Sequence, residues 1–199
     1  MFDKLQQSLL EIQSASFQID SALGNQVLID VPYRSQWDAD AQLSTGDCGI
    51  VSVAMICNWK GISITPDQLI RKAGLATGRS LYSFAELMLA GKAVGLNFRY
   101  VRPARWDDIR AELDAGRPVI PLLRYGELIG NQDVTFTGGH FLVVVGYDTN
   151  GVYVNDSNWW GSRRLEGFRR RIAYDRFERC IGEPLTKTGN NPFQSLFLD

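Results

Sequence analysis

A long apolar stretch that ends in a tight turn constrains the fold of this 199-residue chain more than any other feature. Residues 140–147 read HFLVVVGY, which is the composition and length of a strand inside a sheet. Residues 148–151 read DTNG, a turn sequence, and residues 152–155 provide the returning strand. The sequence therefore predicts a β-hairpin whose first strand is buried.

Helical patterns precede most of the strand patterns along the chain. Helices are expected at residues 48–58, 66–72, 83–94 and 106–115, and from Asp175 onward; strands are expected at 27–31, 96–101, 118–123 and 168–174. The segment 48–58 reads CGIVSVAMICN and is apolar on nearly all sides, so we expect it to be a buried helix. This order predicts an α+β fold, with a helical half packed on an antiparallel sheet half.

The N-terminal segment has a different pattern from the rest of the chain. Apolar residues recur at roughly helical spacing from Phe2 to Leu23, and Gly24 and Asn25 provide a stop signal. We therefore expect residues 1–26 to be an amphipathic helical extension and residues 27–199 to be the main domain. The extension is expected either to pack on the domain or to dock a partner protein.

Composition and charge exclude several classes of protein. Apolar residues make up 45% of the chain, which is enough for a hydrophobic core, and the net charge of −1 argues against a nucleic-acid-binding protein. No apolar run is long enough for a membrane span, and the N-terminus lacks the pattern of a secretory signal, so a cytoplasmic location is expected. Three cysteines and one histidine predict no disulfide framework, no metal site and no cofactor.

Three polar residues stand where this layout would bring chemistry together. Cys48 begins the buried helix, where the positive end of the helix dipole favours a thiolate. His140 lies where a glycine-rich loop, residues 125–139, enters the apolar strand. Asp156 follows the returning strand of the hairpin, so it is expected beside His140, where it would orient the imidazole.

Each of these residues also has a structural interpretation when taken alone. Cys48 could be a buried core cysteine, as Cys57 and Cys180 are expected to be, His140 a core residue and Asp156 a turn residue. The three together form a nucleophile, a base and an orienting carboxylate, and this combination favours a nucleophilic enzyme.

Two segments of the chain resemble a known family. Residues 31–56, VPYRSQWDADAQLSTGDCGIVSVAMI, and residues 138–157, GGHFLVVVGYDTNGVYVNDS, resemble papain-like cysteine peptidases, in particular the bacteriocin-processing peptidases that remove double-glycine leaders and their soluble relatives. The resemblance covers roughly residues 28–160. It implies a papain-like fold with a cleft between its halves, a peptide or protein substrate, Cys48 as nucleophile, His140 as base and Asp156 as the third member of a triad.

The family also has a glutamine upstream of the cysteine whose amide helps to stabilise the oxyanion. Gln36 lies in a segment, YRSQW, that resembles the motif of the soluble relatives, whereas Gln42 has the spacing to Cys48 that papain has. We favour Gln36 because its surrounding motif matches better.

Aromatic and basic residues follow Asp156. Residues 158–161, NWWG, are similar to a papain-type segment in which a tryptophan shields the histidine and its partner, although core aromatics are an equal alternative. The arginines Arg163, Arg164, Arg169, Arg170 and Arg171 are expected on a solvated face rather than in a phosphate site. Alternation along residues 168–174 would turn Arg170 toward the core, where it is expected to pair with an acid.

The sequence therefore favours a cysteine peptidase. Two alternatives stay open: a related acyl-transfer enzyme on the same fold, such as a peptidoglycan amidase or endopeptidase, a deamidase or a transglutaminase-like enzyme, and a catalytically idle binding module. Leader-processing domains are usually fused to membrane spans and a nucleotide-binding domain. This chain contains neither, so leader cleavage coupled to transport is not expected.

Overall fold

The computed structural model describes residues 26–43, 47–79, 81–182 and 192–199. The helix expected at residues 1–24 lies outside the described residues. The elements are β1 (Val27–Leu28), α2 (Cys48–Trp59), α3 (Pro66–Lys72), α4 (Phe84–Lys92), β2 (Phe98–Val101), α5 (Trp106–Asp114), β3 (Val119–Arg124), η1 (Tyr125–Glu127), β4 (Gly139–Phe141), β5 (Val143–Asp148), β6 (Gly151–Asn155), η2 (Gly161–Gly167), β7 (Arg170–Ile172), α6 (Tyr174–Gly182) and β8 (Gln194–Leu198).

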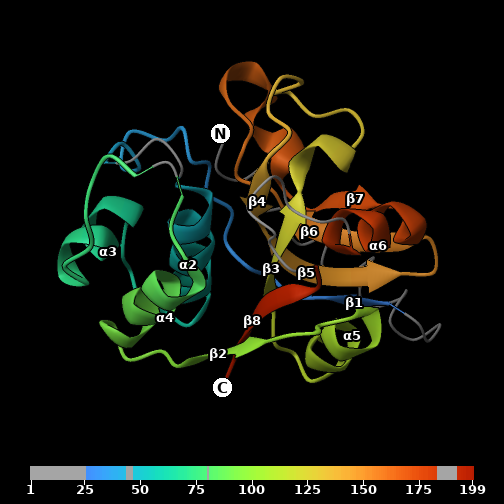
Figure 1. Cartoon of the computed structure of the whole chain (residues 1–199), viewed down its shortest axis with the longest axis horizontal. Coiled ribbons are helices and arrows are strands. Elements are labelled where there is room, and N and C mark those ends of the chain that lie inside the picture. Colours follow the sequence, from blue (N-terminus) through green and yellow to red (C-terminus); the bar gives the residue numbers. More distant parts are fainter. Residues whose placement is uncertain (1–25, 44–46, 80, 183–191) are drawn as a thin grey trace, which may run out of the picture.

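One sheet, whose strands differ in length, runs through the molecule and has helices on both of its faces (Figure 1). Its strands follow the order β2-β8-β3-β5-β6-β7, while β1 pairs with β5 and β4 pairs with β3. Every pairing is antiparallel. Helices α2, α3 and α4 lie to one side of the sheet, and α5 and α6 lie to the other (Figure 1). The α+β class with a helical half on an antiparallel sheet is therefore confirmed.

Alternation along the central strands builds a separate core on each face of the sheet. Side chains in contact with the α2–α4 half include Ile120, Leu122, Val143, Val145 and Leu196. Their neighbours Val119, Leu123, Val144, Val154 and Phe197 belong to the core shared with α5 and α6. This is the two-residue period of a strand that is buried on both faces, and it explains why residues 140–147 are almost continuously apolar.

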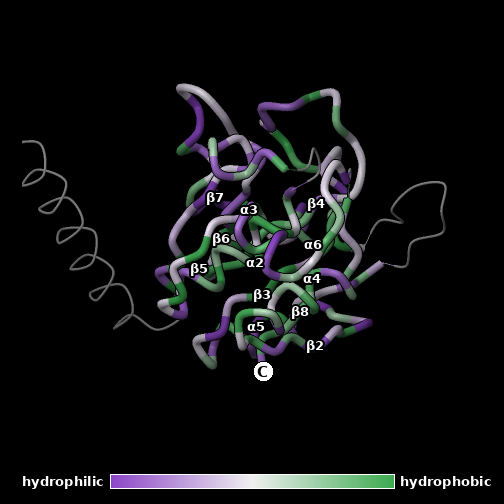
Figure 2. Tube along the Cα trace, turned by 90° about the vertical axis from the view of Figure 1, so that its left-hand side faces the viewer, coloured by the Kyte–Doolittle hydropathy of each residue, from purple (hydrophilic) through white to green (hydrophobic). Residues whose placement is uncertain are grey.

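The hydropathy of the residues differs between the interior and the outer loops. In Figure 2 the hydrophobic stretches gather along the central strands and the helices next to them, and the outer loops are mostly hydrophilic. Within the four described ranges, no helix is long and apolar enough to cross a membrane.

Local sequence signals account for several element boundaries. Helix α3 begins at Pro66 after a capping box formed by Thr65 and Gln68, and α4 begins after a capping box of Ser83 and Glu86. The predicted hairpin is confirmed, because β5 pairs with β6 across the turn from Asp148 to Gly151.

The structure differs from the sequence prediction at four places in the strands. Strand β1 covers only Val27–Leu28 of the predicted 27–31, because the backbone N–H of Val31 turns back to the carbonyl of Ile29. Residues 140–147 form two strands, β4 and β5, interrupted at Leu142, and β4 pairs with β3 rather than with the returning strand. Strand β7 covers only Arg170–Ile172 of the predicted 168–174, because Arg169 has a positive φ of 49° that breaks the extended backbone. Strand β8, which lies between β2 and β3, was not predicted at all.

Candidate active site

Cys48 is the first residue of helix α2, and its sulfur lies against strand β4. The backbone N–H of Phe141 donates a hydrogen bond to Cys48 Sγ at 3.5 Å. The Cys48 carbonyl accepts a hydrogen bond from Ser52 Oγ one turn along the helix, at 2.8 Å. Helix α2 is apolar nearly all round because it is buried from Cys48 to Cys57. The sulfur is therefore held at the start of a helix that is fixed in the core.

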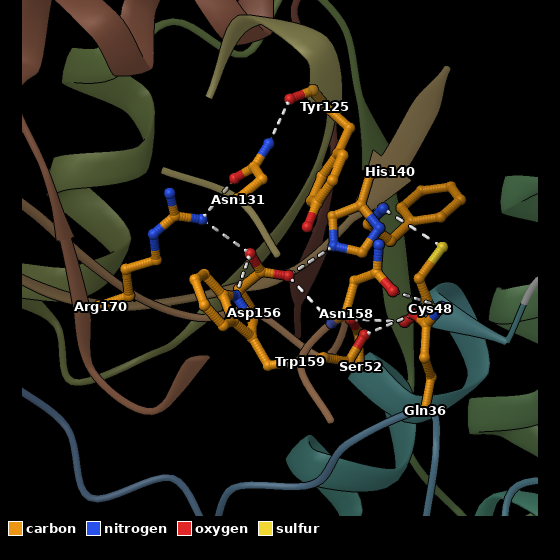
Figure 3. A network of polar contacts seen from close by, with 12 residues as sticks. Gln36, Cys48, Ser52, Tyr125, Asn131, His140, Asp156, Asn158, Trp159 and Arg170 are labelled. Carbon is orange, nitrogen blue, oxygen red and sulfur yellow. Dashed lines mark hydrogen bonds and ion pairs between the residues drawn. The ribbon is translucent and has the colours of Figure 1, made fainter. Parts of the chain in front are cut away.

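His140 and Asp156 meet beside this cysteine. Nε2 of His140 lies 2.8 Å from Oδ1 of Asp156, and the two side chains are 1% and 0% exposed. Since Nε2 faces the carboxylate, Nδ1 is the other ring nitrogen, and the Cys48 sulfur acts electrostatically on His140. The three residues predicted from the sequence are thus brought together, in the order Cys48, His140, Asp156 (Figure 3).

The electrostatics of the pair favour the charged forms of both groups. Burial alone would lower the pKa of His140, but the Cys48 sulfur and the Asp156 carboxylate raise that pKa to about 10. Burial alone would raise the pKa of Asp156, but His140 and Arg170 hold it at about 2. At neutral pH the site therefore contains an imidazolium and a carboxylate.

Four donors surround the Asp156 carboxylate. Besides His140, Oδ1 accepts from the backbone N–H of Asn158 at 3.1 Å. Oδ2 accepts from Trp159 Nε1 and from Arg170, each at 3.0 Å. The prediction that Arg170 turns inward and pairs with an acid is confirmed, and Trp159 contacts the histidine's partner as the similar papain-type segment suggested.

Gln36 lies next to the segment that follows Asp156. Its backbone N–H donates to the carbonyl of Ser157 at 3.0 Å, and its Oε1 accepts from Ser157 Oγ at 3.0 Å. Its Nε2 donates to Asn158 Oδ1 at 3.2 Å. Gln42 is exposed, and its Nε2 donates instead to the carbonyl of Asp38 at 2.9 Å. The structure therefore places Gln36, and not Gln42, in contact with residues of the Asp156 segment.

Aromatic rings cover the imidazole. Tyr125, fully buried in η1, packs edge-on to His140 with ring centroids 4.7 Å apart, and Phe136 packs on Tyr125 at 5.5 Å. The residues of this cover were not predicted from the sequence, because residues 125–139 were interpreted only as a glycine-rich loop. Exclusion of water by these rings strengthens the hydrogen bond between His140 and Asp156.

The other arginines of the basic cluster have acidic partners. Ion pairs join Arg163 to Glu166, Arg164 to Asp38, Arg169 to Asp30 and Arg171 to Asp148. Arg163 and Arg171 are exposed, as expected for a solvated face, whereas Arg164 and Arg169 are half-buried. Each of these guanidinium groups already faces a carboxylate. In the described part of the chain, no group of three or more His, Cys, Asp or Glu side chains is placed to hold a metal ion.

Selective labelling of one cysteine is the first prediction. Burial raises the pKa of Cys57 to about 11 and that of Cys180 to about 12, and both residues are 0% exposed. Cys48 is 5% exposed and lies beside an imidazolium. Limited iodoacetamide treatment of the folded protein at neutral pH should therefore modify Cys48 alone, as peptide mapping by mass spectrometry would reveal. Equal modification of all three cysteines would contradict this.

Comparison with known protein families finds a match over most of the chain. Residues 28–180 match the Peptidase_C39 like family. Comparison with curated proteins finds no match.

Three solved structures share the fold. A C39-like peptidase from Bacillus anthracis is 17% identical with a TM-score of 0.58, over 87% of this chain and 97% of that one. The peptidase domain of Streptococcus ComA, a bifunctional ABC transporter involved in quorum sensing, is 19% identical with a TM-score of 0.57, over 84% and 97%. A double-glycine-motif protease from an AMS/PCAT transporter, in complex with its leader peptide, is 19% identical with a TM-score of 0.52, over 87% and 97%. These likenesses confirm the fold expected from the sequence resemblance.

Proposed function

The chain belongs to the Peptidase_C39 like family, and from this premise we propose that it is a cysteine peptidase that hydrolyses peptide bonds through an acyl-enzyme on Cys48. The observation that carries the proposal is the row formed by Cys48, His140 and Asp156, in which a buried hydrogen bond of 2.8 Å fixes the imidazole beside the sulfur. Its substrate is proposed to be a peptide or an unfolded segment of a protein.

The geometry supports a two-step reaction. The Cys48 thiolate attacks the carbonyl carbon of the scissile bond, and the His140 imidazolium gives its proton to the leaving amine as the C–N bond breaks. A thioester remains on Cys48. Water then attacks the thioester, His140 takes a proton from that water, and the released peptide carries a new carboxyl terminus. Asp156 stays ionised throughout, because its pKa of about 2 lies far below neutral pH.

The oxyanion of each tetrahedral intermediate needs donors that are already in position. We propose the backbone N–H of Cys48 and the side-chain amide of Gln36. Trp37 Nε1 can only donate, so its contact fixes Asn158 Oδ1 as the oxygen and makes the end of Gln36 that meets it the nitrogen. One N–H of Gln36 is then directed to Asn158 Oδ1, and the second remains available to a substrate oxyanion.

This role predicts unequal effects of the two glutamines. Gln36→Ala should lower kcat by about 10²–10³-fold, the usual cost of losing one oxyanion donor. Gln42→Ala is the matched control and should retain nearly full activity, because Gln42 is exposed and contacts the Asp38 carbonyl. Steady-state kinetics of both variants on one peptide would test this, and the reverse ranking would assign the oxyanion hole to Gln42.

The proposed activity is tested by digesting a peptide library and denatured proteins in heavy-oxygen water. A peptidase yields pairs of fragments whose new carboxyl termini carry the heavy isotope, as mass spectrometry would detect. Loss of ammonia without chain cleavage would indicate a deamidase, and cross-linked products would indicate a transglutaminase-like enzyme. Cleavage of cell-wall fragments alone would indicate a peptidoglycan hydrolase. No product from any of these substrates would contradict the proposal and favour an idle binding module.

A further inference from the structure

Arg170 is a nearly buried cation directly behind the Asp156 carboxylate. It lies on strand β7, and its side chain is 12% exposed. Its guanidinium donates to Asp156 Oδ2 at 3.0 Å, to Asn131 Oδ1 at 2.8 Å and to the carbonyl of Ile129. Figure 3 shows the guanidinium and the imidazole of His140 on opposite sides of the carboxylate. Burying a charge this deeply is costly unless it is paired, so these contacts define its orientation.

Asp156 faces groups from several elements, and they differ in charge. His140 on β4 contacts Oδ1, Arg170 on β7 contacts Oδ2, and the phenol groups of Tyr125 and Tyr33 also interact with it electrostatically. Tyr33 donates its hydroxyl to the backbone carbonyl of Asp156, at 3.0 Å. Arg170 is the member of this set with a permanent positive charge, because a guanidinium does not lose its proton in proteins.

Arg170 also reaches the cover of the imidazole. Asn131, which accepts from Arg170, donates from Nδ2 to the carbonyl of Tyr125 at 2.9 Å. Tyr125 in turn packs its ring on His140. One guanidinium therefore contacts both the carboxylate that orients the imidazole and the loop that shields it.

From these contacts we propose that Arg170 is a positioning residue of the reaction. It keeps Asp156 ionised and turned toward His140, and it fixes the segment from Ile129 to Asn131 that supports Tyr125. The inference rests on the proposed function, and it adds a fourth charged group behind Asp156 in the row that begins at Cys48. It also implies that activity depends on Arg170 although this side chain is separated from Cys48 by Asp156 and His140.

Kinetics of three variants test the role. Arg170→Met removes the charge and keeps most of the aliphatic stem, whereas Arg170→Lys keeps the charge and loses the fork of donors. Arg171→Ala is the matched control, since this adjacent arginine is 53% exposed and pairs only loosely with Asp148, at 3.6 Å. We expect kcat to fall by about 10²-fold in Arg170→Met, with KM little changed, because the imidazole is misplaced rather than removed. Arg170→Lys should lie between this variant and the wild type, and Arg171→Ala should match the wild type.

The pH profile separates positioning from a purely structural role. Arg170 lowers the pKa of Asp156, so its removal should let the carboxyl take up a proton at higher pH. The acid limb of kcat/KM should therefore move upward in Arg170→Met, by about one pH unit. The rate of Cys48 alkylation should show the same upward movement. If Arg170 only stabilised the fold, its removal would lower the melting temperature but would leave the acid limb of kcat/KM and the pH dependence of Cys48 alkylation unchanged.

Chemical rescue makes the test independent of folding defects. A cavity of about 310 Å³ lies against Arg170 and is also lined by Leu128, Ile129 and Arg176. Because Arg170 both lines this cavity and contacts Asp156, the Arg170→Ala variant should admit a free guanidinium ion. Millimolar guanidinium should restore part of its activity, whereas urea and sodium chloride at the same concentration should not.

The outcomes are distinct from those of the proposed function. If Arg170→Met keeps the wild-type kcat and pH profile, or if guanidinium restores Arg170→Ala no better than urea does, the positioning role is wrong while the peptidase assignment stands. If the wild type cleaves no peptide, the peptidase assignment fails, but the alkylation profile and its rescue by guanidinium still test Arg170 without a substrate.

Discussion

Replacing Cys48 with alanine should abolish turnover, with kcat reduced by at least about 10⁴-fold, as happens when the nucleophile of a comparable triad is removed. Without the sulfur no thioester can form, and His140 and Asp156 alone offer only a general base. The remaining pair should also change its titration. The Cys48 sulfur contributes to raising the pKa of His140, so this pKa should fall from about 10 in Cys48→Ala, as NMR titration of the single histidine would show.

The matched control for this variant is Cys57→Ala in the same helix. Cys57 is buried in the core nine residues along α2 from Cys48, so its removal should cost stability, about 1 kcal/mol, and leave kcat unchanged. Peptide cleavage near the wild-type rate by Cys48→Ala would exclude Cys48 as the nucleophile. Loss of activity in Cys57→Ala with an unchanged fold would equally contradict the assignment.

Substitutions of Asp156 should have the second largest effect. Asp156→Ala removes both the orienting acceptor and the charge, and kcat should fall by about 10³–10⁴-fold. It also leaves Arg170 buried without its carboxylate, so a clear drop in the melting temperature is expected. Asp156→Asn should be milder, because one acceptor oxygen remains for His140. It should still be impaired, since each carboxylate oxygen accepts from two donors and the amide NH₂ must then face two of them.

The pH profile of Asp156→Asn should shift in a direction that a folding defect would not produce. Asp156 raises the pKa of His140, so the neutral amide should lower that pKa. The imidazolium is then lost at lower pH, and the basic limb of kcat/KM should move downward relative to the wild type. The expected order of activity is wild type, Asn, then Ala. An Asp156→Ala protein that turns over like the wild type at every pH would make Asp156 a turn residue, with Asn158 as the next candidate for the triad.

Much of the fold follows from local patterns in the sequence. The capping boxes at Thr65 and Ser83 and the DTNG turn mark boundaries through backbone hydrogen bonds that form within a few residues. Strand β8 was missed because its position depends on pairing with residues of β2 and β3 that lie 72 to 100 residues earlier in the chain. The interruption at Leu142 lies opposite Pro121 of β3, which has no backbone N–H to donate, since β4 and β5 pair with β3 in the same register. A continuous apolar run cannot reveal this interruption.

The candidate site likewise contains residues that local patterns predict and residues whose roles depend on the fold. Cys48, His140 and Asp156 were predictable because residue type, helix start and hairpin geometry all indicate the same chemistry. Arg170 was predicted to turn inward from the alternation of β7, but its partner followed only from the fold. Tyr125 and Asn131 gave no local signal, since a cover over His140 depends on how the loop at residues 125–139 folds back onto β4.

The central claim is that the acyl group of the substrate is carried by Cys48. The most direct measurement starts from a peptide that the enzyme cleaves, resynthesised with an activated ester in place of the scissile bond. This ester is mixed with the enzyme, and the reaction is quenched within milliseconds. Intact-mass and peptide-mapping spectrometry should then find one acyl group per chain, attached to Cys48, and the adduct should disappear as hydrolysed product accumulates. An acyl group on any other residue, or turnover with no covalent adduct during a burst of ester cleavage, would contradict the account.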